Sequence, residues 1–296
     1  MRRGGSKTRL RQSPKSKEFS LDRPARLWKN RSEVRDFEPN HFPSPNGVVR
    51  GQIDHFVSSG YRVIIPDQRG YNLSDKPAGI ASYSIDLLAR DVVGVLDNVA
   101  GSKAFVVGHD WGAAVTWYLA ARYSDRIHRA AMLSVPHPRV FLKNLITSPG
   151  QLRRSWYIFF FQLPWLPELI VHRRDWALLV RGLRNTSAPG VFSDSDLKQY
   201  KESWARKGAL TAMLNWYRAA LFRPSKVAFD PEGSRVKVPA LLIWGKNDQF
   251  AGEALARQSL QYCMMDTLRC LRLQAIGSTT KSPHGSITCC PNFLPN

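Results

Sequence analysis

The chain has 296 residues, of which 43% are hydrophobic, and this is enough for one large domain with a packed core. Its 43 lysines and arginines exceed its 23 acidic residues, which gives a formal net charge of +20. Many of the basic residues fall near the start of the chain, and no zinc-finger, RNP or helix-turn-helix pattern accompanies them. A specific nucleic-acid-binding protein is therefore not expected.

The four cysteines indicate neither a disulfide framework nor a paired metal site. Three of them lie beyond residue 269, and Cys289 and Cys290 are adjacent. We therefore expect a reducing compartment and assign the protein to the cytoplasm.

Residues 1–49 are rich in Arg, Lys, Ser and Pro and show no sustained apolar period, so we expect a basic, disordered arm. The arm lacks the apolar core that a secretory signal needs. Order is predicted to begin near Gly51, and a strand is predicted over 61–66. A helix is predicted between Ser84 and Gly101, because a capping serine precedes apolar residues at three- and four-residue steps.

The sequence G-H-D-W-G at 108–112 predicts a nucleophile elbow, in which a strand passes through a sharp turn into a helix. It follows the apolar run 105–107 and continues into small and apolar residues. Gly108 and Gly112 stand two positions on either side of the middle residue, where strand and helix approach closely. That residue is Asp110. A carboxylate there attacks an electrophilic alkyl carbon to form an ester, whereas a serine attacks a carbonyl carbon.

Beyond the elbow, strands and helices continue to alternate, which predicts a mostly parallel sheet flanked by helices. A strand is predicted around 130–135, before a V-P-H-P turn whose His137 we interpret as structural. Residues 141–223 lose the alternation and become aromatic, helical and punctuated by Pro, which is typical of an inserted helical lid. The strand pattern returns over 238–244, before the loop that carries Asp248.

The elbow resembles that of the epoxide hydrolases of the α/β-hydrolase fold, and the haloalkane dehalogenases share it. The loop D-Q-R-G-Y-N-L-S-D-K-P that begins at Asp67 also resembles this family, as do two aromatic segments around Tyr157 and Tyr217. The resemblance covers about 50–262. It implies a first core part over 50–140, a lid over 141–223 and a second core part over 224–262.

The resemblance also implies a reaction on a small-molecule epoxide that needs neither a metal nor a cofactor. Asp110 attacks an epoxide carbon while the phenols of Tyr157 and Tyr217 hydrogen-bond to the ring oxygen, on which negative charge develops. Water then hydrolyses the ester to a diol, helped by a histidine that Asp248 orients. The side chains expected to line the substrate pocket are Trp111, Phe161 and Trp216.

We expect Asp110 at the carboxyl end of a central strand and Asp248 after a neighbouring strand, with both facing one pocket. Tyr157 and Tyr217 should project from the lid toward Asp110. The aromatic run 155–165 is too short to span a bilayer. A peripheral contact between the lid and a membrane surface stays open.

Both ends of the chain depart from the family pattern. The family's H-G-x-P turn, which supplies an oxyanion donor, is echoed only by H-F-P at 41–43. The family's general base is a histidine beyond the acid, and the only histidine after Asp248 is His284, between proline and glycine. The tail over 263–296 shows neither the expected strand nor the final helix. Such ends are typical of a reading-frame change or of unrelated exons joined to a family core.

Three functions remain open. The first is an epoxide hydrolase, impaired in turnover because the matched histidine is missing. The second is a haloalkane dehalogenase, in which a halide would bind to the N–H groups of Trp111 and of Trp156, Trp165 or Trp216. The third is a non-catalytic remnant of the family or an interaction protein.

Overall fold

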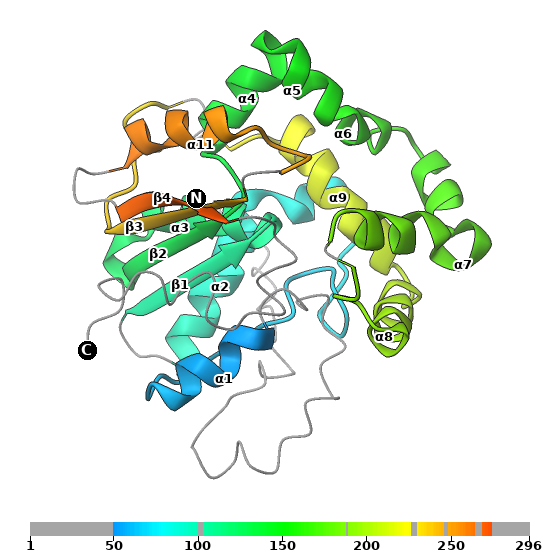
Figure 1. Cartoon of the computed structure of the whole chain (residues 1–296), viewed down its shortest axis with the longest axis horizontal. Coiled ribbons are helices and arrows are strands. Elements are labelled where there is room, and N and C mark those ends of the chain that lie inside the picture. Colours follow the sequence, from blue (N-terminus) through cyan, green and yellow to red (C-terminus); the bar gives the residue numbers. More distant parts are fainter. Residues whose placement is uncertain are drawn as a thin grey trace, which may run out of the picture.

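A computed structural model of the chain describes residues 50–99, 103–187, 189–225, 230–245, 248–263 and 268–273, the last of these as backbone. Its sheet is parallel throughout and has the strand order β1-β2-β3-β4 (Figure 1). The strands are β1 (Ala104–His109), β2 (Ile127–Leu133), β3 (Ala240–Gly245) and β4 (Leu268–Leu273). The strands predicted around 130–135 and 238–244 are therefore confirmed as β2 and β3.

The helices nearest the sheet cover it, and most of them share one large hydrophobic core with it. They are α1 (Arg50–Ser58), η2 (Ile80–Tyr83), α2 (Ile85–Val99), α3 (Trp111–Arg122), η3 (Ser124–Arg126), α11 (Glu253–Ser259) and η4 (Leu260–Tyr262). Helix α3 packs against β1 and β2, α2 packs against α3, and α11 packs against β3. Because α3 buries Ala113, Leu119 and Ala120 in this core, its position relative to β1 is fixed.

Between β2 and β3, the described residues of 138–222 form a series of helices, in the part of the chain where the sequence predicts a lid over 141–223. The inserted helices are α4 (Pro138–Thr147), α5 (Pro149–Arg154), α6 (Trp156–Phe160), α7 (Leu166–Asn185), α8 (Asp194–Trp204) and α9 (Ala209–Phe222). They arch away from the sheet, from α4 at the top of Figure 1 to α8 at the lower right. Among the described residues, no helix combines the length and the apolar character that crossing a membrane requires.

Two expectations about the sheet were wrong. The segment predicted as a strand over 61–66 forms only a single bridge, at Ile64. It lies beside β1, since the ring of Tyr61 packs edge-on against Phe105 at 5.9 Å, but Pro66 has no N–H to extend the pairing.

The second wrong expectation was that no strand follows Cys263. Strand β4 pairs in parallel with β3, with Leu268 opposite Leu241. Its sequence L-R-C-L-R-L is a short apolar run with partial alternation, which is a weak but real strand signal. The expectations for residues 1–49, for 274–296 and for His284 lie outside the described residues.

The strand, turn and helix expected around the G-H-D-W-G sequence are present. Asp110 joins β1 to α3 with φ +51° and ψ −126°, a backbone conformation that is rare for a residue with a side chain. A Cβ on Gly108 would lie 2.2 Å from the carbonyl oxygen of Gly112 and 2.5 Å from Oγ1 of Thr116. A Cβ on Gly112 would meet only Nε2 of Gln68, at 3.5 Å. The close approach of strand and helix therefore depends on Gly108 rather than on both glycines.

We predict that Gly108→Ala destabilises the protein by about 3 kcal/mol, because the added methyl group meets a backbone carbonyl that the core holds in place. Gly112→Ala is the matched control. It adds the same methyl group inside a helix with room for it, so it should be neutral or stabilise by up to about 1 kcal/mol. Urea unfolding monitored by circular dichroism measures both changes. Equal losses in the two variants would contradict this assignment.

His137 lies where β2 passes into the inserted helices, and its side chain is buried. Its Nε2 is 2.9 Å from the carbonyl oxygen of Ser234, and its Nδ1 accepts from the backbone N–H of Arg139 at 3.3 Å. The ring stacks on Tyr262 at 4.2 Å. Burial lowers the pKa of His137 to about 4. These contacts support the structural interpretation of this residue.

The lowered pKa of His137 predicts an acid-sensitive fold. The folded protein holds the neutral ring, so the unfolded chain takes up a proton first as the pH falls below about 6.5. Up to about 3 kcal/mol of stability should be lost between about pH 6.5 and pH 4. Urea unfolding across this range should show a shallower pH dependence for His137→Gln. The exposed His128, changed to Gln, should keep the full dependence, and identical slopes in the two variants would refute the prediction.

Candidate active site

A cavity of about 740 Å³ is lined by the elbow, by the loop after β3 and by the inserted helices. The elbow contributes Asp110 and Trp111, the loop contributes Asp248, and helices α6 and α9 contribute Tyr157 and Tyr217. The cavity therefore brings together all four residues that the sequence nominated for chemistry. No group of three or more His, Cys, Asp or Glu side chains in the described part of the chain is placed to bind a metal ion.

Asp110 presents its carboxylate to this cavity. The residue is exposed, and its side chain forms no capping hydrogen bond with α3. Its backbone carbonyl instead accepts the N–H groups of Ala113 and Ala114, at 2.9 and 3.2 Å. The first N–H groups of a helix have no acceptor within the helix, and the helix dipole favours negative charge at this end. The carboxylate is thus accessible and lies where an anion is stabilised.

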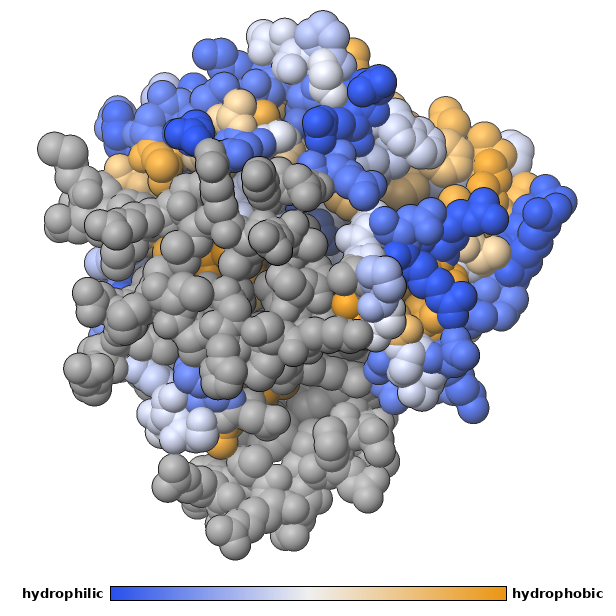
Figure 2. All heavy atoms as spheres, viewed as in Figure 1, coloured by the Kyte–Doolittle hydropathy of each residue, from blue (hydrophilic) through white to orange (hydrophobic). Residues whose placement is uncertain are grey.

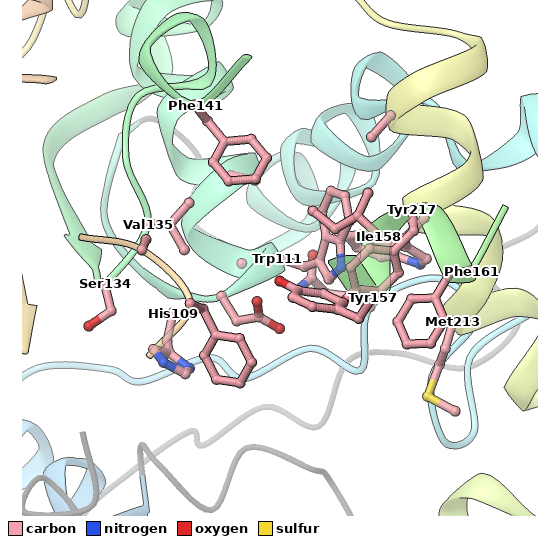
Figure 3. Close-up of a pocket in the computed structure, with 18 of the residues that line it drawn as sticks. His109, Trp111, Ser134, Val135, Phe141, Tyr157, Ile158, Phe161, Met213 and Tyr217 are labelled. Carbon is pink, nitrogen blue, oxygen red and sulfur yellow. The ribbon is translucent and has the colours of Figure 1, made fainter. Parts of the chain in front are cut away.

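The two lid tyrosines converge near this carboxylate. The rings of Tyr157 and Tyr217 lie 6.0 Å apart at 81°, and Figure 3 shows both on the same side of the cavity as Trp111. Burial raises the pKa of each phenol well above its ordinary value, and the negative charge of Asp110 raises it further. Both hydroxyls therefore stay protonated at neutral pH and can donate hydrogen bonds.

A buried arginine fixes α6 relative to α9. The Nε of Arg218, on α9, donates to the carbonyl oxygen of Phe161 at 3.0 Å, and its Nη2 donates to that of Leu163 at 2.9 Å. The same guanidinium forms a two-point ion pair with Glu168, at 2.7 and 3.1 Å. Because these contacts hold the end of α6 on α9, they set the separation of the tyrosines that the two helices carry.

Asp248 is held by its own loop. Its Oδ1 accepts the backbone N–H groups of Phe250 and Ala251, at 2.8 and 2.9 Å. Burial raises the pKa of this carboxyl, and the two hydrogen bonds oppose the rise. One carboxylate oxygen is thus committed to the loop.

The strands that carry the two carboxylates are arranged differently from our expectation. Among the four strands of the described sheet, β1 stands at one end of the order rather than in its middle, and β2 separates it from β3. The chain crosses from β1 to β2 through α3 and so places these strands side by side. Asp110 and Asp248 still line one cavity, because parallel strands end at the same edge of a sheet.

His109 is a cavity residue that the sequence reasoning did not single out. Burial lowers its pKa, while the charges of Asp110 and Asp248 act in the opposite direction, so the ring lies in the field of both carboxylates. Of the histidines in the described ranges, only His109 and His137 line the cavity. Its place in the sequence could have identified it, because the residue directly before an elbow nucleophile is the last residue of the strand that leads to the site.

The three expected pocket residues, Trp111, Phe161 and Trp216, all line the cavity. Trp216 is buried and donates its indole N–H to the carbonyl oxygen of Arg69 at 3.0 Å, so it forms part of the wall. The indole N–H of Trp111 is buried and faces Tyr217, whose pKa it lowers. It forms no hydrogen bond of acceptable geometry with any described residue. It remains available to a ligand.

Two of the tryptophans considered as halide donors lie elsewhere. Trp156 and Trp165 are exposed, at 62% and 69%, and neither lines the cavity. The alternative that uses them as halide ligands is therefore wrong.

Known proteins share this arrangement. Residues 45–269 match the α/β hydrolase fold family. The AB hydrolase superfamily protein YfhM of Bacillus subtilis (strain 168) is 43% identical over 214 residues, which are 72% of this chain and 73% of that protein. Epoxide hydrolase 3 of Xenopus tropicalis is 34% identical over 229 residues, covering 75% of this chain. The match spans only 60% of that relative's length.

A solved epoxide hydrolase structure is also similar to this chain. A variant of an epoxide hydrolase from Bacillus megaterium, complexed with its product (R)-3-[1]naphthyloxy-propane-1,2-diol, superposes with a TM-score of 0.66 at 27% identity. The superposition covers 81% of this chain and 86% of that one. The chain therefore belongs to the α/β-hydrolase-fold family and is an epoxide hydrolase-like α/β hydrolase.

Proposed function

We propose that this protein opens small-molecule epoxides through an ester on Asp110. A carboxylate oxygen of Asp110 bonds to a ring carbon, the C–O bond of that carbon breaks, and the ring oxygen takes a proton from Tyr157 or Tyr217. The product of this step is a hydroxyalkyl ester. The observation that carries the proposal is an accessible carboxylate facing two protonated phenols in one cavity.

The relatives agree with this substrate class. The B. megaterium enzyme was crystallised with a diol as its product, and that diol carries a naphthyl group. The cavity of this chain offers apolar walls of matching character, from Ile158, Phe161 and Met213 among others (Figure 3). An epoxide with an aryl substituent is therefore a suitable first test compound.

The second step adds water to the ester carbonyl, releases the diol and restores Asp110. A general base has to accept a proton from that water, and Asp248 would orient it. The histidine that the family pattern places beyond Asp248 has no match, and His284 lies outside the described residues. His109 is the histidine that lies in the field of both carboxylates, but burial lowers its pKa and weakens it as a base. We propose that ester hydrolysis is therefore the slow step.

This mechanism predicts an ester that accumulates. A positioned base contributes about 10²- to 10⁴-fold, and one oxyanion donor about 10²- to 10³-fold, so a site without both would hydrolyse the ester slowly. Intact-protein mass spectrometry after incubation with styrene oxide should show one stable adduct, located on Asp110 by peptide mapping. Asp110→Asn should give no adduct, while Asp67→Asn, a second cavity carboxylate, should still give it.

Rapid production of diol over many turnovers would contradict the slow second step but not the first. His109→Gln, His137→Gln and His284→Gln would then identify the base. A chain that forms no adduct and no diol, while folded by circular dichroism, would favour a non-catalytic member of the family.

The two lid tyrosines should control the rate of adduct formation. Tyr157→Phe and Tyr217→Phe should each slow it by about 10²-fold, because each removes one donor to the developing alkoxide. Tyr71→Phe is the matched control, since Tyr71 also lines the cavity and its pKa is also raised by burial and by Asp110. It should change the rate less than about threefold. The same loss in all three variants would mean that the rate reports packing rather than donation.

A haloalkane dehalogenase remains the second candidate, because the buried N–H of Trp111 has no hydrogen-bond partner among the described residues and could bind a halide. Incubation with 1-chlorobutane distinguishes the two functions. Release of chloride, even once per protein with an alkyl adduct on Asp110, would favour the dehalogenase, whereas an epoxide adduct without chloride release from 1-chlorobutane favours the proposal above.

A further inference from the structure

The segment over 156–170 exposes an unusual amount of apolar surface. Trp156 and Trp165 are more than half exposed, and Phe159, Leu163, Leu169 and Ile170 are also exposed. We call these six residues the outer lid surface. Figure 2 shows a group of apolar residues at the outer edge of the inserted helices, over the region where α6 leads into α7, bordered by hydrophilic residues. A contiguous exposed apolar patch of this kind marks a binding surface more often than a neutral part of a fold.

The cavity explains only one side of this segment. Tyr157, Ile158 and Phe161 of the α6 region line the cavity, and Ile158 is buried. Trp156 and Phe159 point out of the fold from the same five-residue helix. The inward aromatic residues line the site, whereas Trp156 and Phe159 remain 62% and 44% exposed, even though Trp156 contacts the ring of Phe160.

The outer lid surface is fixed rather than loose. Arg218 holds the carbonyl groups of Phe161 and Leu163, and it pairs with Glu168. These contacts bracket Trp165 in the sequence. The exposed side chains are therefore presented on a rigid backbone, which lowers the entropy that is lost when they bind.

Positive charge flanks the same surface along the sequence. Residues 149–185 contain the arginines Arg153, Arg154, Arg173, Arg174, Arg181 and Arg184, all of them exposed. Both acidic residues of this stretch have cationic partners, because Glu168 pairs with Arg218 and Asp175 with Lys201. Of the six arginines, Arg184 is paired with Asp194, and the other five make up the excess. An occupant of the outer lid surface thus meets apolar aromatic groups flanked by excess positive charge.

We propose that the outer lid surface docks on an anionic lipid bilayer. Tryptophan and phenylalanine side chains settle at the boundary between headgroups and acyl chains, and arginines beside them attract anionic headgroups. Because no described helix can cross a bilayer, the contact is peripheral. This inference concerns the outer side of α6 and goes beyond the proposed reaction. It is independent of whether an epoxide alkylates Asp110.

Co-sedimentation of the full chain with lipid vesicles tests the proposal. We expect binding to mixed phosphatidylcholine–phosphatidylserine vesicles, weaker binding to phosphatidylcholine alone, and a decrease as salt is raised. The double variant Trp156→Ser, Trp165→Ser should weaken binding at least about tenfold, since it removes the two most exposed aromatic anchors. Arg173→Ser with Arg174→Ser should reduce the preference for phosphatidylserine and the salt dependence.

Leu73→Ser is the matched control. It removes an exposed apolar side chain, 43% accessible, outside the outer lid surface, and it should bind vesicles like the parent chain. The basic residues at the start of the chain are unchanged in every variant, so they cannot account for a loss in the tryptophan variant alone. Circular dichroism and urea unfolding confirm that each variant is folded.

Three results would overturn the proposal. One is no binding to either vesicle, and another is an equal loss in the tryptophan variant and in Leu73→Ser. The third is a dimer in sedimentation velocity that the tryptophan variant abolishes, without vesicle binding by the parent chain, because it would assign the surface to a second copy.

Discussion

The site depends on the close approach of β1 to α3. Gly108 packs directly against the carbonyl group of Gly112, and this contact forces the residue between them, Asp110, into a strained backbone conformation. Such a conformation costs of order 1 to 3 kcal/mol and persists only where the surrounding structure determines it. Here the surrounding structure is the core, since α3 buries Ala113 and Leu119 against the sheet. In this conformation the carboxylate makes no capping hydrogen bond with α3 and lines the cavity.

A second constraint organises the inserted helices. The guanidinium of Arg218, on α9, donates to the carbonyl oxygens of Phe161 and Leu163, which follow the end of α6. A buried ion pair such as that with Glu168 contributes little net stability, because both charges lose their hydration. The ion pair instead holds the guanidinium of Arg218 in position. One guanidinium holds the connection between α6, which carries Tyr157 and Trp156, and α7, before which Trp165 lies, so the cavity and the outer lid surface share one support.

The local elements could be predicted from the sequence, whereas their pairing could not. The period of apolar residues located α2, and the elbow pattern located Asp110 between β1 and α3. Strand order was missed because Asp248 lies 138 positions beyond Asp110, and no local pattern encodes which strand lies between them. Likewise, α6 has five residues, too few for a helical period, so only resemblance to a family pointed to Tyr157. His109 was overlooked because its environment consists of two carboxylates brought together by the fold.

The same electrostatics bear on the fate of the proposed ester. In the free protein, the charges of Asp110 and Asp248 both oppose the effect of burial on the pKa of His109. Formation of an ester at Asp110 removes one of these charges, so the pKa of His109 falls further at the moment when a base is needed. Asp248 alone then supports the ring, and burial raises the pKa of its own carboxyl. A histidine next to the nucleophile is thus a weaker base for the second step than one that interacts only with Asp248. The first step neutralises Asp110, which is one of the two charges that raise the pKa of His109.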